Sequence, residues 1–226
     1  MIGIISDIHG NAPALRTVIQ KLDSYGCERI ISLGDVAGYY CLVNECIDLL
    51  RSKNVMNIMG NHDHYLLSNT SCLRSTSANI CLDYQRSVIS DYNLEWLRQS
   101  LPVYDTHYYS ARHGGWNDRL DEYIQDFDFN DAKEYSQRIF ISGHTHIQKM
   151  QAGDDGKIYF NPGSVGQPRD GDNRAAFAVI YDNGEIALQR VNYDVDEIVH
   201  AMNKAGFDDR MSACLYKGVK IGGEIA

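Results

Sequence analysis

The amino-acid sequence predicts an α/β fold, and two observations carry this prediction. The first third of the chain alternates short apolar runs with longer stretches whose apolar residues recur at helical spacing. The last third consists mainly of short apolar runs separated by turn residues, which is typical of strands. Alternating strand and helix units predict parallel strands that are buried on both faces, with functional loops at their carboxyl ends.

The first third contains three predicted strands and two predicted helices. After the first strand, apolar residues recur at helical spacing at Leu15, Val18 and Leu22, and Gly26 is a stop signal. The pattern then repeats along the chain. The predicted strands cover 2–6, 29–35 and 55–63, and the predicted helices cover 12–26 and 44–53.

The rest of the chain changes from helical to strand-like character. Residues 76–99 are predicted to be mostly helical, 101–114 to form a strand that runs into a loop, and 118–127 to form another amphipathic helix. A closing helix is predicted over 194–206, with Asp194 as its cap and Gly206 as its stop. Four strands are predicted before it, the last two joined by the hairpin signal DNG, over 137–146, 157–164, 175–182 and 185–193.

Composition limits the classes of protein and partner. With 226 residues, 44% of them hydrophobic, the chain is expected to form one domain over residues 1–226. The formal net charge is −9, and no run of Lys or Arg offsets it locally, so we expect no binding to long nucleic acids. A small phosphate substrate would need a concentrated local positive charge, such as a metal ion.

The sequence also predicts the location of the protein and the state of its thiols. The amino terminus has no basic segment before a long apolar run, and no stretch approaches the length of a membrane span. We therefore expect a cytoplasmic protein without a membrane partner. The six cysteines show no CxxC spacing, which favours reduced structural thiols. No pattern in the sequence predicts an oligomeric state.

Ligand-type residues follow the strands. The sequences SDIHGN, LGDVAG and MGNHDH come at the ends of the first three predicted strands. The carboxyl ends of parallel neighbours meet at one edge of a sheet, so these residues are expected to lie together. ARHGG and SGHTH follow later strands, also beside glycines. The metal-ligand candidates are Asp7, His9, Asp35, Asn61, His113, His144 and His146.

Each candidate also has an ordinary structural explanation as a cap, a turn residue or a surface loop residue. Five separate loops would have to end in ligand-type residues by chance, so the set as a whole favours a metal site. Imidazole, carboxylate and amide groups without thiolates suit Mn, Fe, Zn, Ni or Co. Seven candidates are too many for one ion and suit two divalent ions that share a bridging carboxylate.

Such a pair of ions is suited to phosphoryl chemistry. Two metals ~3.5–4 Å apart polarise a phosphoryl oxygen and lower the pKa of a bridging water, so that a bridging hydroxide attacks. His62 is then the expected general acid for the leaving group, provided that a nearby carboxylate keeps it oriented and protonated. We expect manganese, with iron, nickel and zinc as alternatives.

At this point the motifs resemble a known family. DIHGN, GD at 34–35, GNHD at 60–63, HGG at 113–115 and GHTH at 143–146 are similar to the calcineurin-like metallophosphoesterase signature. NPGSVGQPRDG at 161–171 resembles a segment of small bacterial phosphoesterases of the diadenosine-tetraphosphatase-related type. The resemblance implies a four-layer α/β/β/α sandwich with two central mixed sheets. The strand pattern by itself does not predict the second sheet.

The resemblance also implies a role for each candidate. Asp35 would bridge the metals, and His62 would be the catalytic histidine. The implied ligands are Asp7, His9 and His146 for one metal, and Asn61, His113 and His144 for the other. The implied substrates are small phosphodiesters or nucleotide-type esters. Dinucleoside polyphosphates and phosphoproteins are alternatives, and a non-catalytic scaffold would be expected to lose His62 and some ligands.

Substrate contacts are less clearly marked. Asn11 and Arg169 are candidates for binding substrate oxygens, although a helix start explains Asn11 as well and the hydrophilic loop around Arg169 favours a solvated side chain. The loop after Asp35 departs from the usual family segment. Its residues Tyr39, Tyr40 and Cys41 are expected to reshape one wall of the pocket.

Overall fold

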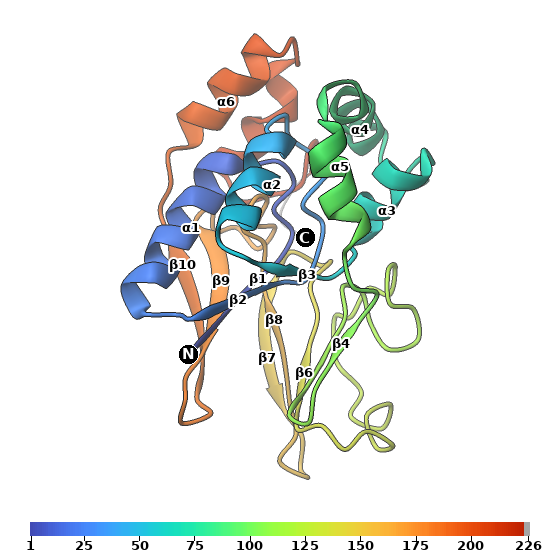
Figure 1. Ribbon diagram of the computed structural model, residues 1–226, viewed down its shortest axis with the longest axis vertical. Helices are drawn as coiled ribbons and strands as arrows, with labels where there is room; N and C mark the ends of the chain where they lie inside the picture. The colour runs from blue at the N-terminus through green and yellow to red at the C-terminus, as the bar shows by residue number, and fades with distance from the viewer. Residues whose placement is uncertain (224–226) are drawn as a thin grey trace.

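The computed structural model describes residues 1–223 and contains two five-stranded sheets (Figure 1). In the first sheet the strand order is β10-β9-β1-β2-β3. β1, β2 and β3 are parallel, whereas β9 runs antiparallel to both β1 and β10. These strands cover Ile2–Ile5 (β1), Arg29–Ser32 (β2), Met56–Asn57 (β3), Ala175–Ile180 (β9) and Ile186–Val191 (β10).

The second sheet has the order β4-β5-β6-β8-β7. Its three central strands, β5, β6 and β8, are parallel, and β4 and β7 are antiparallel strands at its two edges. These strands cover Tyr104–Asp105 (β4), Tyr109–Ala111 (β5), Ile139–Ile141 (β6), Gln148–Ala152 (β7) and Ile158–Pro162 (β8). The two central mixed sheets confirm the predicted α/β sandwich.

The two sheets pack face to face through apolar side chains. Successive residues of a strand point to opposite faces, and the strands carry apolar residues on both faces. Ile4 and Ile31 of the first sheet share a buried cluster with Ile141 and Phe160 of the second. The neighbouring residues of the same strands point to the opposite faces. Ile5, for example, belongs to the cluster beneath the helices.

Helices cover the other face of the first sheet, and Figure 1 shows α1, α2 and α6 above it. The first helix begins where Asn11 accepts a hydrogen bond from the Ala14 amide and ends at Gly26, as its sequence predicts. Asp194 caps the last helix in the same way. The helices cover Ala12–Tyr25 (α1), Val43–Ser52 (α2), Asn61–Ser68 (α3), Thr76–Val88 (α4), Asp91–Arg98 (α5) and Val195–Lys204 (α6), followed by the 3-10 turns Asp209–Met211 (η1) and Ala213–Tyr216 (η2).

The predicted amphipathic helix over 118–127 is wrong. This segment forms turns in which the Glu122 carboxylate accepts the backbone N–H groups of Asn117 and Asp118, at 2.7 and 3.2 Å. The Asp118 carboxylate accepts two more from the residues that follow it. These side-chain bonds compete with helical ones. Phe127 stacks on Tyr159 of β8, with ring centroids 4.7 Å apart, so an irregular layer covers the outer face of the second sheet.

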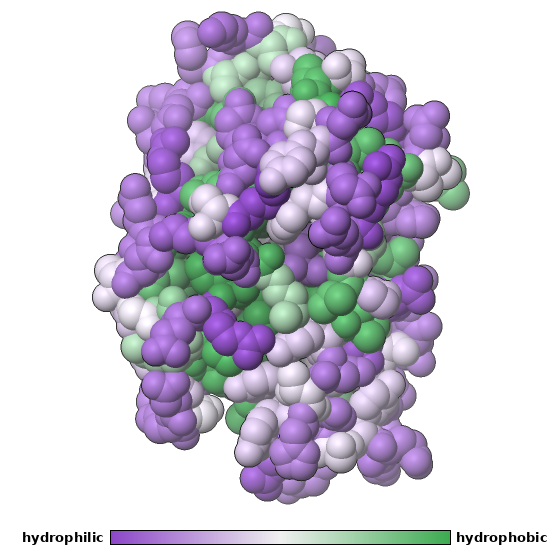
Figure 2. All heavy atoms as spheres, in the orientation of Figure 1, coloured by the Kyte–Doolittle hydropathy of each residue, from purple (hydrophilic) through white to green (hydrophobic). Residues whose placement is uncertain are grey.

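Two smaller differences concern strands. The third predicted strand is reduced to β3, because α3 already begins at Asn61. The sequence pattern missed β7, whose residues are partly exposed at the sheet edge. Figure 2 shows mostly hydrophilic residues over the helices, with hydrophobic residues gathered around the position of β2 and β3. Within residues 1–223, no helix is long and apolar enough to cross a membrane.

Candidate metal centre

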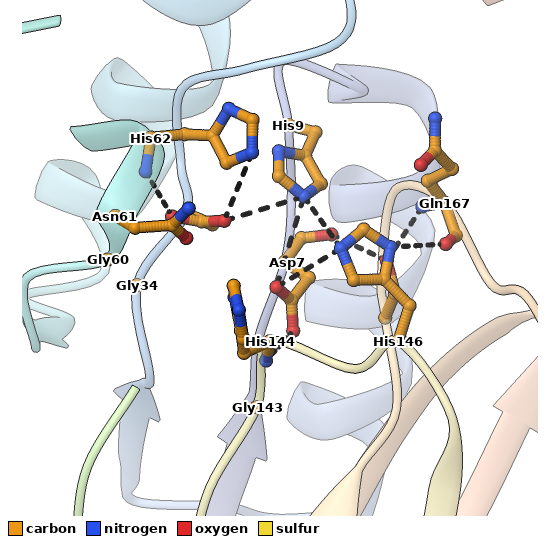
Figure 3. A network of polar contacts seen from close by, with 12 residues as sticks. Asp7, His9, Gly34, Gly60, Asn61, His62, Gly143, His144, His146 and Gln167 are labelled. Atoms are coloured by element: carbon orange, nitrogen blue, oxygen red, sulfur yellow. Dashed lines mark hydrogen bonds and ion pairs between the residues drawn. The ribbon is translucent and has the colours of Figure 1, made fainter. Parts of the chain in front are cut away.

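All seven candidate ligands lie together and are buried, although they come from five loops of two sheets. Figure 3 shows several of these side chains converging from opposite sides. The first three loops belong to the first sheet and carry Asp7, His9, Asp35 and Asn61. The others follow β5 and β6 of the second sheet and carry His113, His144 and His146.

The backbone is strained at these loops. Five of the seven residues have a positive φ, between 53° and 66°, a region that non-glycine residues rarely adopt: Asp7, His9, Asp35, His144 and His146. Such strain costs roughly 1–3 kcal/mol per residue and persists only where the surrounding structure imposes it. The sequence signal is the glycine beside most of these residues, which allows the chain to bend but does not reveal their own strain.

Three histidine rings are fixed by backbone carbonyls. The Nδ1 atoms of His9, His113 and His146 lie 2.8, 2.9 and 2.6 Å from the carbonyl oxygens of Ala37, Leu33 and Gln167. A carbonyl can only accept, so each Nδ1 carries a proton, and in the neutral ring each Nε2 keeps its lone pair. This is the usual outer support of a metal-binding histidine.

The free Nε2 atoms point into two adjacent groups. In the first, the Nε2 atoms of His9 and His146 are 3.0 Å apart, and Asp7 Oδ1 lies 3.9 and 3.4 Å from them. Two neutral imidazole lone pairs repel at this distance unless a cation or a proton lies between them. Ligands ~2.1 Å from one ion at about a right angle are separated by about 3 Å, which matches this spacing.

In the second group, His113 Nε2 lies 3.0 Å from Asn61 Oδ1 and 3.4 Å from Asp35 Oδ2. His144 completes this group with a ligand atom within 4.8 Å of those of Asp35 and His113. The same Asp35 Oδ2 lies 3.7 Å from His9 Nε2 of the first group. Asp35 is thus placed between the groups, as a bridging ligand must be.

Unpartnered polar atoms show that this donor set fits divalent ions. Asp7 Oδ1, Asp35 Oδ2 and His144 Nε2 are buried and make no hydrogen bond. A buried polar atom without a partner costs about 1–3 kcal/mol, and more if it is charged. The three atoms belong to both groups and face the space between the imidazoles, so ions held there would satisfy them.

The pKa shifts of the ligand-type residues also fit a site for cations. Burial raises the pKa of Asp7 well above its usual value. Burial alone would also raise the pKa of Asp35, but His113 and His62 outweigh it and the pKa falls. Burial opposes protonation of His113, yet Asp35 raises its pKa to about 9. Without cations the cluster therefore takes up protons, and divalent ions would displace them.

Residues 1–184 match the family model described as the calcineurin-like phosphoesterase superfamily domain. The chain belongs to this superfamily. It is a metal-dependent phosphoesterase, in agreement with the two ligand groups.

Similar proteins match nearly the whole phosphoesterase. Uncharacterized protein MJ0912 of Methanocaldococcus jannaschii is 32% identical, and the alignment covers 96% of this chain and 98% of the relative. A metallophosphoesterase crystal structure from Sphaerobacter thermophilus is 26% identical, with a TM-score of 0.82, and covers 96% of this chain and 98% of that one. The hypothetical protein PH1004 of Pyrococcus horikoshii shares the fold, with 20% identity, a TM-score of 0.82, and 97% and 100% coverage.

In this phosphoesterase, Asp63 has a structural role that the sequence analysis missed. Its buried carboxylate accepts the amides of Asp35 and Ala37, each at 2.9 Å, and that of Gly60 at 3.2 Å. It therefore fixes the loop that carries Asp35. The GNHD motif contains this aspartate, but its partners Asp35 and Ala37 lie 28 and 26 residues away and could not be inferred from spacing.

His62 lies beside the second group on α3. Its Nε2 is 4.0 Å from Asp35 Oδ2, and its ring contacts those of Tyr39, Tyr65 and His9. Burial lowers its pKa, whereas Asp35 opposes that shift. The nearby carboxylate that we expected is that of Asp35, on the Nε2 side of the ring, whereas Nδ1 has no hydrogen-bond partner within residues 1–223. The ring is held by packing instead.

The two substrate-binding candidates have different surroundings. Arg169 lines a cavity of about 390 Å³ that also contains Asp35, His62 and His146. Asn11, the other candidate, does not line this cavity. Its buried side chain caps α1 and donates hydrogen bonds to the Gly166 carbonyl and the Tyr193 hydroxyl, so its polar atoms already have partners.

The loop after Asp35 forms part of the cavity wall. Tyr39 lines the cavity, whereas Tyr40 and Cys41 are buried in the apolar cluster behind it. All six cysteines are free thiols. The Tyr40 hydroxyl forms a hydrogen bond with Cys214 Sγ, 3.6 Å away, in which either atom can be the donor. It also accepts a hydrogen bond from the Gln167 side-chain amide at 3.0 Å. Gln167 also accepts two hydrogen bonds from Arg169, so this loop helps to position Arg169.

Proposed function

We propose that this protein hydrolyses small phosphate esters, of the phosphodiester or nucleotide type, with two divalent transition-metal ions. The observation that carries the proposal is the position of Asp35 Oδ2, unpartnered and 3.4 to 3.7 Å from a histidine of each group. A carboxylate oxygen shared by two sets of neutral imidazoles fits a dinuclear centre. We expect manganese, with iron, nickel or zinc as alternatives, since these ligands suit all four.

The proposed ligands of one ion are Asp7, His9 and His146, those of the other are Asn61, His113 and His144, and Asp35 contacts both. Bound divalent ions supply Lewis-acid polarisation of the phosphoryl oxygens and a water of lowered pKa. The backbone carbonyls hold the histidines with a proton on Nδ1, so each Nε2 is the nitrogen that faces an ion, and His113 gives up its second proton when the ion binds. The strained backbone fixes the carboxylates in advance.

His62 is proposed as the general acid that gives a proton to the leaving oxygen. Its imidazole lies at the cavity wall beside Asp35, and general acid catalysis contributes about 10²- to 10⁴-fold. Arg169 is proposed to bind a phosphate oxygen. Its guanidinium lies over the Tyr39 ring, 5.3 Å from the centroid, and is oriented by Gln167.

Small substrates fit the shape of the site. A cavity of about 390 Å³ is in the range for small-molecule ligands. All seven proposed ligands are buried and four of them line the cavity, so a long polyanion would have to insert one ester group while its remainder met a chain of net charge −9. This supports small phosphate esters over long nucleic acids.

The test compares p-nitrophenyl phosphate with bis-p-nitrophenyl phosphate after chelation and readdition of Mn²⁺. We expect Mn²⁺-dependent release of nitrophenol, reduced about 10²- to 10⁴-fold in His62→Ala without loss of bound metal. His64→Ala, an exposed histidine on the same helix, is the matched control and should keep wild-type turnover. Absence of turnover with Mn²⁺, Fe²⁺, Ni²⁺ and Zn²⁺ would contradict the proposal. Equal activity in His62→Ala would contradict the role of His62.

A further inference from the structure

The cavity above the candidate metal centre is more positive than the rest of the molecule. The chain has 30 acidic and 21 basic residues, yet three cations line this cavity: Arg74, Arg169 and Lys220. Among residues 1–223, Asp35 is the one carboxylate that lines it, and it belongs to the metal centre. Neither Arg74 nor Lys220 is a proposed metal ligand, and both side chains line the cavity, where they can contact a bound anion.

Arg74 is held in place before any ligand arrives. It lies in the loop between α3 and α4, and its Nη2 is 3.0 Å from Asp121 Oδ1. The Tyr65 hydroxyl donates to the same carboxylate, at 3.2 and 3.3 Å. Asp121 thus joins two walls of the cavity and orients the guanidinium. An oriented side chain loses less conformational entropy when it binds an anion.

Lys220 reaches the cavity from the far end of the described chain. Gly171 donates a backbone hydrogen bond to the Gly218 carbonyl at 3.0 Å, and Val219 is buried in the apolar cluster that contains Tyr40. Gly218 has a φ of +65°, and an added Cβ would lie 2.6 Å from a backbone atom of Asp172. This close approach places Lys220 near the loop that carries Arg169.

The segment that carries Lys220 lies outside the family match, which ends at residue 184. It nevertheless contributes Lys220 and Ile221 to the cavity wall. The metal centre is therefore completed by the matched region, whereas part of the outer cavity is added by this carboxyl-terminal segment. A residue placed there can change substrate choice without changing the metal ligands.

Resting on the proposed phosphoesterase function, we propose that Arg74 and Lys220 form a second anion subsite, which binds an additional phosphate of the substrate. The substrate class is then nucleotides with two or more phosphate groups. One phosphate contacts the metal centre, and another is bound by two cations from separate segments. Lys220 and the guanidinium of Arg74, which pairs with Asp121 through Nη2, can both donate to a further phosphate, a group that a monoester lacks.

The test compares two ligands that differ by one phosphate-like group. AMP and the non-hydrolysable α,β-methylene-ADP share the nucleoside, so base contacts cancel in the comparison. Their dissociation constants are measured by calorimetry on Mn²⁺-loaded protein, with free Mn²⁺ held constant. We expect the wild type to bind the diphosphate analogue more tightly than AMP. In Lys220→Gln and in Arg74→Gln, its Kd should rise roughly three- to tenfold, with less than a twofold change for AMP.

Two matched variants control for charge and for folding. Lys217→Gln changes an exposed lysine on the same segment, and Arg98→Gln changes an exposed arginine that is also paired with a carboxylate. Both should leave the two Kd values unchanged. Equal weakening of both ligands, or an unchanged diphosphate Kd in Lys220→Gln and Arg74→Gln, would overturn the subsite.

The binding result is independent of turnover. If the nitrophenyl esters are hydrolysed but neither variant changes the diphosphate Kd, the subsite is wrong and the phosphoesterase proposal stands. If no ester is hydrolysed while the binding difference is found, the proposed reaction is wrong and the subsite stands. Equal thermal unfolding midpoints of the variants and the wild type show that the comparison concerns folded protein.

Discussion

His9 and His146 are 137 residues apart in the chain, yet their Nε2 atoms lie 3.0 Å from each other. Neither nitrogen carries the proton, because each Nδ1 is bonded to a backbone carbonyl. The two rings are also stacked, with centroids 4.8 Å apart. Such a contact between lone pairs is stable only when a cation or a proton lies between them, and it supports the proposed first ion site.

Removal of one histidine from each group should separate the two sites. We expect His146→Ala to retain about one ion per chain, and His113→Ala to lose the other site, whereas the wild type binds about two. Loss of a direct ligand should weaken affinity by more than the ~10- to 100-fold typical of an outer partner. Metal content after dialysis, measured by mass spectrometry, checks this. His107→Ala, an exposed histidine, is the control, and two ions retained in both variants would disprove the assignment.

Asp35→Asn should weaken both ions at once. The asparagine can still accept the His62 amide that Asp35 Oδ1 accepts at 2.9 Å, so the loop should be preserved. The negative charge at Oδ2, which faces both groups, is lost. We expect both ions and the Mn²⁺-dependent activity to be lost together, as measured by titration of metal against turnover. A variant with full turnover and two ions would show that Asp35 does not bridge.

Asp105 and Arg112 should stabilise the second sheet in a pH-dependent way. The nearly buried Arg112 donates to both Asp105 oxygens, at 2.7 and 3.0 Å, directly before His113 in the chain. Burial raises the pKa of Asp105, but the bonds from Arg112 and Ser110 outweigh it and bring the pKa below its ordinary value of 3.8. The stabilisation is therefore present above pH 3.8 and is lost as the pH falls through the lower folded-state pKa.

We expect Asp105→Asn to unfold about 1 kcal/mol more easily at pH 7, a value reduced because the carboxylate is partly exposed. The difference from the wild type should shrink below pH 3.8. Urea unfolding at neutral and acidic pH measures it. Asp126→Asn, whose carboxylate is largely exposed, is the control. A difference that stays constant down to acid pH would show that the ion pair is not its cause.

Gly218→Ala should reproduce the effect of losing Lys220. The added methyl group would meet the backbone of Asp172, so the carboxyl-terminal segment has to move away from the cavity. We expect a higher Kd for α,β-methylene-ADP by calorimetry. Gly222→Ala is the matched control, because Gly222 has a similar φ of +69° but no atom within 4 Å of an added Cβ. Equal effects of the two substitutions would show that backbone strain, and not displacement, is responsible.

Local sequence patterns predicted much of the fold. The apolar period and the cap at Asn11 located α1, and Asp194 located α6. The same reasoning failed over 118–127, because the apolar residues there recur at helical spacing, whereas Glu122 and Phe127 find better partners in backbone amides and in Tyr159. Residue spacing shows which side chains would share a helix face. It does not show whether contacts with residues far away in the chain are more favourable than that helix.

In the candidate site, too, some features follow from local sequence and others depend on contacts between distant residues. Strand ends and glycine bends are local features, so the amino-acid sequence is enough to predict which ligand-type residues follow which strands. Three contacts come from tertiary packing: His9 meets His146, Asp63 supports the Asp35 loop, and Lys220 lines the cavity. These contacts join residues far apart in the chain. They depend on how two sheets and a carboxyl-terminal segment pack, and packing free energy is a property of the whole fold.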